Sequence, residues 1–66
     1  SLGQGKASGE SLVGSRIKVW WPMDQAYYKG VVESYDAAKK KHLVIYDDGD
    51  QEILYLKNQK WSPLDE

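Results

Sequence analysis

The 66-residue chain lacks cysteine and phenylalanine, and it contains a single histidine and only two prolines. Without cysteine, neither a disulfide nor a Cys-ligated zinc ion can hold the fold, and the absence agrees weakly with a reducing compartment. No run of about 18 apolar residues exists, so we expect no membrane-spanning helix. A formal net charge of -1 argues against a protein that binds nucleic acid mainly through phosphates. Direct DNA binding is therefore not expected.

What the sequence does contain is aromatic: three tryptophans and five tyrosines. A chain this short forms at most one small domain, in which large rings must supply much of the buried area. The first thirteen residues, SLGQGKASGESLV, are rich in Gly and Ser and have no apolar period. Ordering them would cost about 1 to 2 kcal/mol per residue with little burial in return. We therefore expect a flexible leader at 1–13, a domain at 14–64 and a tail at 65–66, as a fragment of a longer protein.

Short strand patterns follow one another after the leader. Apolar alternation and turn residues predict strands over 16–21, 27–36, 42–47, 51–56 and 60–64, with a single helical turn at 57–59. In the second strand the apolar phase switches between Val32 and Tyr35, which indicates a β-bulge or a sharp bend, and Gly30 allows close approach of a neighbouring backbone. Five short strands with tight connections predict an all-β antiparallel barrel, because closure removes exposed strand edges.

Catalytic and metal-binding residues are scarce. His42 is the only histidine and has no Cys partner, so we interpret it as an ordinary strand residue. The carboxylates of the DDGDQE segment lack the ligand spacing of an EF-hand. We therefore expect no enzymatic activity, no metal site and no cofactor.

Three aromatic residues lie at predicted strand ends: Trp21, Tyr28 and Tyr46. Strand ends meet at one rim of a small barrel, so these rings can converge there. Such a cluster binds an alkylammonium group, because ring faces are electronegative and the methyl groups are apolar. A carboxylate in the adjacent YDDGD turn adds a charge partner. The alternative is that these rings belong to the core, as we expect for Tyr35, Tyr55 and Trp61.

Two stretches, IKVWWPMDQAYYKGVVESYD and HLVIYDDGDQEILYL, resemble a Tudor domain, a five-stranded SH3-like barrel of the Royal superfamily that binds methylated lysine or arginine. The likeness covers residues 14–64 and is greatest to the Tudor domains of plant sister-chromatid-cohesion regulators and related plant chromatin proteins. It implies a methyl-ligand cage made of Trp21, Tyr28, Tyr46 and Asp48. Where many members have a fourth aromatic residue, this chain has an acid, and three further residues are possible rim positions: Asp50, Glu52 and Trp20.

The resemblance implies a nuclear histone reader. We expect it to bind mono- or dimethylated lysine, most plausibly on the histone H3 tail, because such ammonium groups keep an N–H for a carboxylate. The domain is expected to be a monomer on its own and part of a chromatin or cohesin-associated protein. Two alternatives stay open: a methyl-arginine reader, and a barrel without a cage that binds protein, or nucleic acid through Lys39, Lys40 and Lys41.

Overall fold

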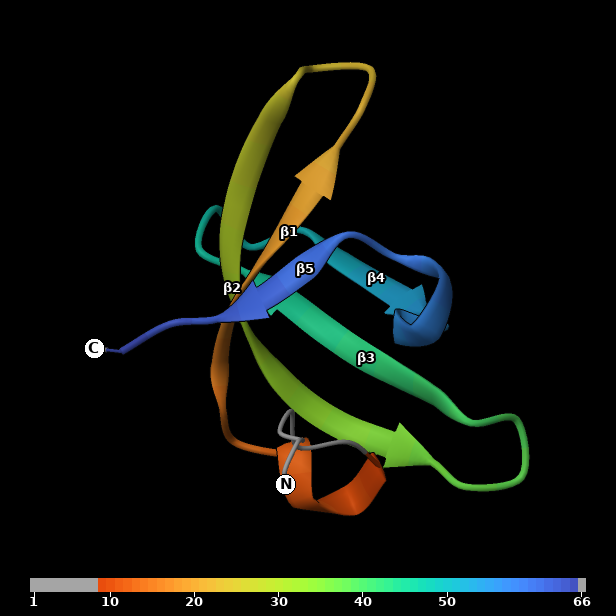
Figure 1. Cartoon of the computed structure of the whole chain (residues 1–66). Coiled ribbons are helices and arrows are strands. Elements are labelled where there is room, and N and C mark those ends of the chain that lie inside the picture. Colours follow the sequence, from red (N-terminus) through yellow and green to blue (C-terminus); the bar gives the residue numbers. More distant parts are fainter. Residues whose placement is uncertain (1–8, 66) are drawn as a thin grey trace.

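The computed structural model describes residues 9–65, which form five strands and two short 3-10 helices. Figure 1 shows their arrangement. In chain order the elements are η1 (Gly9–Leu12), β1 (Arg16–Trp21), β2 (Ala26–Asp36), β3 (Lys41–Tyr46), β4 (Gln51–Leu54), η2 (Leu56–Asn58) and β5 (Trp61–Pro63). Neighbouring strands are antiparallel, in the order β4-β3-β2-β1-β5. This confirms the predicted all-β, SH3-like class, with the helical turn one residue earlier than expected.

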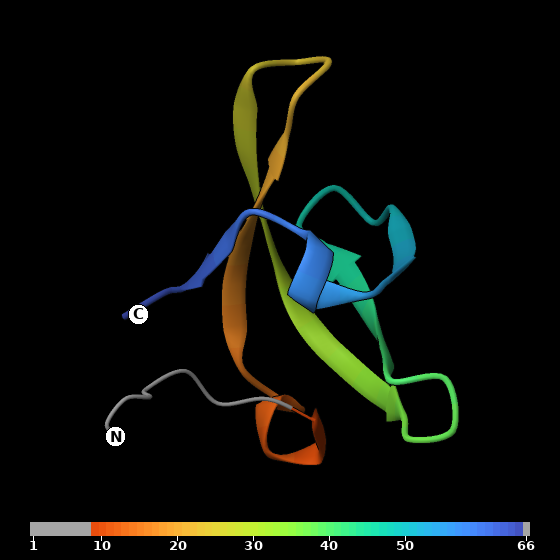
Figure 2. The same cartoon turned by 45° about the vertical axis from the view of Figure 1, so that its right-hand side comes forward.

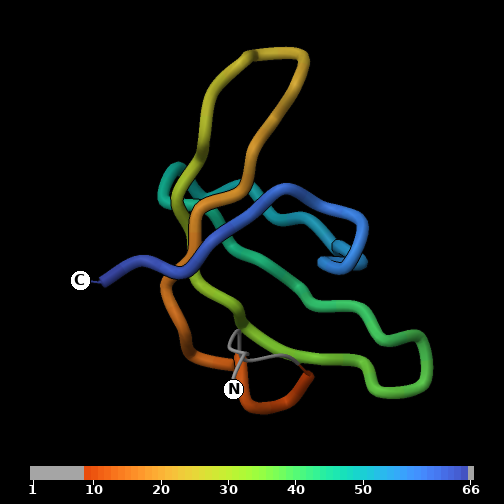
Figure 3. Tube along the Cα trace, viewed as in Figure 1, coloured from red at the N-terminus to blue at the C-terminus, as the bar shows by residue number. Residues whose placement is uncertain are grey.

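The long strand β2 connects the two halves of the sheet. Its first half pairs with β1 and its second half with β3, and the trace bends between them (Figure 3). The register with β3 shifts between Val32 and Ser34, which is the irregularity that the sequence predicted. At Gly30 a Cβ atom would lie 2.7 Å from the carbonyl oxygen of Ile45, so only glycine lets the two strands approach this closely.

The core follows from strand alternation. Ile17 and Val19 of β1 are 0% and 1% exposed, because every second side chain of this strand points inward. The other buried apolar residues come from β2, β3, β4, η1 and η2: Leu12, Val32, Val44, Tyr46, Leu54 and Leu56. Trp21 and Trp61 are partly buried and pack against this cluster. Between residues 9 and 65, no helix is long and apolar enough to cross a membrane.

The segment before β1 corrects the expected leader. Residues 9–12 form η1, and Leu12 is buried in the core with 3% exposure. Beyond η1, the Gly14 N–H donates to the Val32 carbonyl at 2.8 Å, and the Val32 N–H donates to the Ser15 carbonyl at 3.0 Å. The predicted leader is therefore wrong for residues 9–13, because Leu12 buries its side chain against residues that are distant in sequence. Residues 1–8 lie outside the described part of the chain.

Candidate functional site

Three rings from three adjacent strands lie at one end of the sheet. In the antiparallel ladders, Val19 pairs with Tyr28 and Gly30 pairs with Tyr46, which brings Tyr28 and Tyr46 to the end where β1 finishes at Trp21. The Trp21 ring centroid lies 5.9 Å from that of Tyr28 and 5.9 Å from that of Tyr46, at interplanar angles of 87° and 76°. These are edge-to-face contacts, the arrangement that aromatic quadrupoles favour.

The rings line a small open cavity with a volume of about 150 Å³. Three carboxylate side chains, Asp24, Asp48 and Asp50, complete its lining. A site with aromatic walls and several carboxylates attracts a cation that also carries apolar surface, because rings and carboxylates both favour positive charge.

Tyr46 is the most deeply placed of the three rings, with 5% exposure. Its hydroxyl accepts a hydrogen bond from Trp21 Nε1 at 3.2 Å and donates one to Glu52 Oε1 at 3.0 Å. Burial raises the pKa of Tyr46 to about 12, and the hydrogen bond to Glu52 acts in the same direction. The hydroxyl therefore stays protonated and holds the Trp21 indole and the Tyr46 ring in a defined relation.

Tyr28 is the exposed wall of the cavity, with 40% exposure. Its hydroxyl donates a hydrogen bond to Asp24 Oδ2 at 2.7 Å, and this bond is the largest cause of a raised Tyr28 pKa. The negative charge of Asp48, which lines the same cavity, also raises the pKa of Tyr28. The ring is thus tethered at its hydroxyl while much of its surface faces solvent.

The acidic turn after β3 divides its carboxylates among different contacts. Gly49 has φ of 94°, the left-handed conformation that a tight turn needs, and Asp48 Oδ1 accepts the Asp50 N–H at 3.0 Å. Asp47, the first acid of this turn, accepts two hydrogen bonds from the Arg16 guanidinium at 2.6 and 3.1 Å. The Arg16 guanidinium lowers the pKa of the Asp47 carboxyl.

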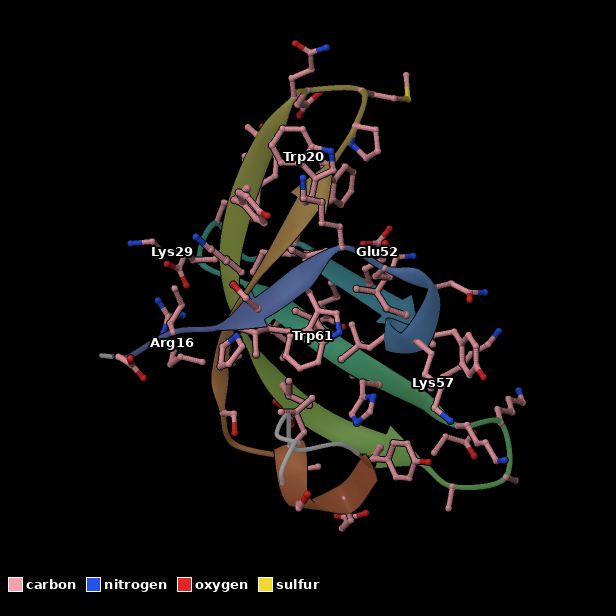
Figure 4. The ribbon with its side chains drawn as sticks, in the orientation of Figure 1. Arg16, Trp20, Lys29, Glu52, Lys57 and Trp61 are labelled. Atoms are coloured by element: carbon pink, nitrogen blue, oxygen red, sulfur yellow. The ribbon has the colours of Figure 1, made fainter. Side chains whose placement is uncertain are left out.

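The structure brings Trp21, Tyr28, Tyr46, Asp48 and Asp50 together around the cavity, but it places the other two expected rim residues elsewhere. Trp20 and Glu52 are not among the residues that line the cavity. Figure 4 shows Trp20 beside β1 and Glu52 beside β4.

Strand alternation turns Trp20 to the opposite face of β1 from Trp21. There the centroid of the Trp20 ring lies 5.1 Å from that of the Tyr27 ring and 4.8 Å from Lys60 Nζ. The Glu52 carboxylate instead accepts the hydrogen bond that the Tyr46 hydroxyl donates.

Asp24 is the lining residue that the sequence reasoning missed. It lies in the loop between β1 and β2, four residues before Tyr28. The available signal was an acid in a short loop directly between two candidate wall residues. Within residues 9–65, the carboxylates of the cavity included, no three His, Asp or Glu side chains are grouped in a way that could hold a metal ion.

The sequence comparisons identify the family. A family model described as "PTM/DIR17-like, Tudor domain" matches residues 14–60. The chain is 46% identical over 65 residues to "Sister chromatid cohesion protein PDS5 homolog A" of Arabidopsis thaliana. This alignment covers 98% of this chain and 4% of that protein. It is 42% identical over 52 residues to "DNA mismatch repair protein MSH6" of the same plant, covering 79% and 4%. It is also 46% identical over 50 residues to "Histone-lysine N-methyltransferase TRX1" of Oryza sativa subsp. japonica, covering 76% and 5%.

The chain therefore belongs to the Tudor domain family, a family of chromatin-associated binding modules. This confirms the resemblance found in the sequence, including the likeness to plant cohesion and chromatin proteins. The chain spans less than a tenth of the length of the relatives named above.

Proposed function

We propose that this Tudor domain is a non-catalytic reader that binds mono- or dimethylated lysine in the cavity between Trp21, Tyr28 and Tyr46. The observation that supports this most strongly is the shared lining of one small cavity by these three rings and by Asp24, Asp48 and Asp50. Each accessible ring face contributes about 1 kcal/mol to binding a cation. The contributions of the three rings and of one charged hydrogen bond, less the cost of ordering a peptide, correspond to dissociation constants of roughly 10 to 200 μM.

The acidic wall favours the lower methylation states. A mono- or dimethylammonium group keeps an N–H that a carboxylate can accept, and such a bond contributes about 1.5 to 3 kcal/mol. A trimethylammonium group has no N–H, and its third methyl displaces water from a carboxylate without replacing that hydrogen bond. Asp48 and Asp50 are the candidates for this contact, because Asp24 is tied to the Tyr28 hydroxyl, whereas the bond that Asp48 Oδ1 accepts comes from the backbone of its own turn and leaves the carboxylate at the cavity.

We favour lysine over methyl-arginine, because the lining is acidic and Trp21 forms no parallel pair with Tyr28 or Tyr46. A planar guanidinium binds best between two parallel ring faces, where it stacks on both. Here Trp21 stands at 87° to Tyr28 and at 76° to Tyr46, so it forms no parallel slot with either tyrosine. A compact, rounded ammonium group fits three walls of this kind.

The alternative of a barrel that binds nucleic acid through residues 39–41 receives less support. This segment belongs to the β2–β3 connection, where Asp36 Oδ1 accepts the N–H groups of Ala38 and Lys39 at 3.0 and 3.2 Å. It is an ordinary tight turn with exposed lysines, at the opposite end of β2 from Tyr28.

We assign the ligand to a histone tail, most plausibly that of H3, and the domain to the nucleus. Relatives named for sister chromatid cohesion and for histone-lysine methylation support a chromatin setting. A lysine- and arginine-rich tail also complements the acidic cavity electrostatically. With an affinity this modest, the isolated domain, expected to be a monomer, adds avidity to the other contacts of its parent protein.

Titration by NMR of the 15N-labelled domain tests the proposal. The probes are H3-tail peptides carrying un-, mono-, di- or trimethylated lysine, and the same peptides carrying dimethylarginine. The mono- and dimethyl-lysine forms should bind most tightly and shift the indole N–H signal of Trp21. A trimethyl form that binds most tightly contradicts the acidic-wall argument, and tighter binding of the arginine peptide assigns the site to the other ligand.

Tyr28→Ala should keep the fold and lose methyl-lysine binding. Tyr27→Ala is the matched control, because it removes a similarly exposed tyrosine from the neighbouring position, on the other face of β2. If both variants bind as the wild type does, the cavity is not the binding site.

A further inference from the structure

A second, larger cleft lies at the other end of the sheet from the methyl-lysine site. Its volume is about 430 Å³, against about 150 Å³ for the cavity lined by Trp21. It lies between η1, the end of β2, the start of β3, and the β4–η2–β5 segment. Figure 2 shows how the backbone of these elements is arranged. Tyr35, Tyr55 and Trp61 supply aromatic walls, and Leu12 and Leu56 supply aliphatic ones.

The charge of this cleft is opposite to that of the methyl-lysine site. Lys40 and Lys57 line it, and no Asp or Glu of residues 9–65 does. Figure 4 shows Lys57 on the side of the domain near the β2–β3 connection. The methyl-lysine cavity, in contrast, has three carboxylates and no basic side chain. A basic peptide that is attracted to one end of the domain is therefore not attracted to the other.

A buried histidine marks this cleft as polar as well as aromatic. His42 lines it, is 4% exposed, and stacks on Tyr35 with ring centroids 4.5 Å apart. Its Nε2 must donate to the Gly9 carbonyl oxygen at 2.9 Å, since a carbonyl only accepts. In the neutral ring Nδ1 is then an acceptor, and among the residues described it is buried without a hydrogen-bond partner.

We propose that this cleft is a second binding site, which takes an acidic peptide segment of a partner protein through one large aromatic anchor side chain. The anchor packs between the aromatic and aliphatic walls, and acidic neighbours on the peptide pair with Lys40 and Lys57. An indole anchor is the best probe, because it offers the largest aromatic surface to these walls. The domain thereby holds a cationic ligand at one end and an anionic partner at the other.

A peptide suits this cleft better than a nucleotide, which also combines a ring with negative charge. Phosphate groups are usually held by arginine forks or by several converging backbone N–H groups. No arginine in the described part of the chain lines this cleft, and its two lysines come from separate segments, the β2–β3 connection and η2. Two separated point charges match carboxylates that are spread along a peptide.

NMR titration with synthetic pentapeptides tests the proposal. The probe is Glu-Asp-Trp-Asp-Glu with blocked termini, and the controls are Glu-Asp-Ala-Asp-Glu and Lys-Arg-Trp-Arg-Lys. The first should shift signals of His42, Lys57 and Trp61 and leave those of Trp21 and Tyr28 in place, while both controls bind at least roughly tenfold more weakly. Equal binding of the basic peptide, no response at millimolar probe, or an equal response to adenosine monophosphate overturns the proposal.

A matched pair of charge reversals locates the site. Lys40→Glu/Lys57→Glu should weaken binding of the acidic probe roughly tenfold, whereas Lys39→Glu/Lys60→Glu changes the net charge equally at positions outside the cleft. Equal weakening by the two double variants means general charge attraction and overturns the assignment. Tyr28→Ala should leave acidic-probe binding intact, so a failure of the methyl-lysine site and a failure of this cleft are read out separately.

Discussion

Removing a single oxygen atom from Tyr46 tests how the proposed methyl-lysine site is held together. Tyr46→Phe keeps the buried ring and deletes the hydroxyl that links Trp21 Nε1 to Glu52 Oε1. The Trp21 N–H and the Glu52 carboxylate then lose their shared partner. Because the Trp21 indole is only partly buried, it is expected to change its orientation as well as to lose a hydrogen bond.

The expected cost follows from the two bonds. A neutral hydrogen bond contributes about 0.5 to 1.5 kcal/mol and one to a charged acceptor about 1.5 to 3 kcal/mol. The indole bond is long at 3.2 Å and Glu52 is only partly buried, so water recovers some of this loss. We expect the free energy of unfolding to fall by about 2 kcal/mol, a large share of the roughly 3 to 10 kcal/mol typical of a chain this size. Methyl-lysine affinity should fall severalfold, because one wall is less well oriented.

Urea denaturation followed by far-ultraviolet circular dichroism measures the stability change. Tyr27→Phe is the control, since Tyr27 is 38% exposed and its ring, which Phe retains, makes the described contacts with Trp20 and Lys18. The control should change stability by no more than about 0.5 kcal/mol. If Tyr46→Phe matches the control in both stability and methyl-lysine affinity, the hydroxyl does not organise the site and the reasoning fails.

Three further predictions concern stability. Because the pKa of Tyr46 is raised to about 12 in the folded state, the free energy of unfolding should fall as pH rises from 10 towards 12, by at most about 2.5 kcal/mol. Denaturation at a series of pH values checks this, and Tyr46→Phe should lack that component of the decline. Gly30→Ala should destabilise the domain by about 1 to 3 kcal/mol, because its Cβ would lie 2.7 Å from the Ile45 carbonyl oxygen, and a thermal melt unchanged from wild type would contradict the close approach. Leu12→Ala should cost about 2 to 4 kcal/mol in urea denaturation, whereas a negligible cost would restore the idea of an unpacked leader.

Most of the fold could be predicted from local patterns. Alternation of apolar and polar residues located all five strands, because the buried face of each strand repeats every second residue. The phase switch after Val32 indicated the irregularity of β2 for the same reason. The N-terminal segment was mispredicted because one buried leucine within a Gly- and Ser-rich stretch produces no periodic signal. Its burial depends on contacts with distant residues, which no local pattern contains.

The aromatic residues of the candidate site could be predicted from their positions at strand ends, but the contacts of its carboxylates could not. That Trp21, Tyr28 and Tyr46 are close neighbours follows from antiparallel pairing, so aromatic residues at strand ends were sufficient to anticipate it. The partners of the carboxylates were not predictable, since Arg16 and Asp47 are 31 positions apart in the chain. Which acid faces the cavity depends on the turn conformation around Gly49, and composition alone says nothing about that.

The carboxylates near Tyr46 fall into two groups. Some accept a hydrogen bond from a tyrosine of the site, and the others line the cavity without such a bond. Asp24 and Glu52 each accept a hydrogen bond from a tyrosine hydroxyl, so each fixes the orientation of one ring at its edge. When a tyrosine hydroxyl donates a hydrogen bond to a carboxylate, electron density increases on its oxygen and in the ring. The ring face then attracts a cation more strongly. Asp48 and Asp50 line the same cavity without such a bond to a ring. Negative charge therefore acts twice in the proposed reader, first by orienting and polarising the aromatic walls, and then by offering an acceptor to the ammonium N–H.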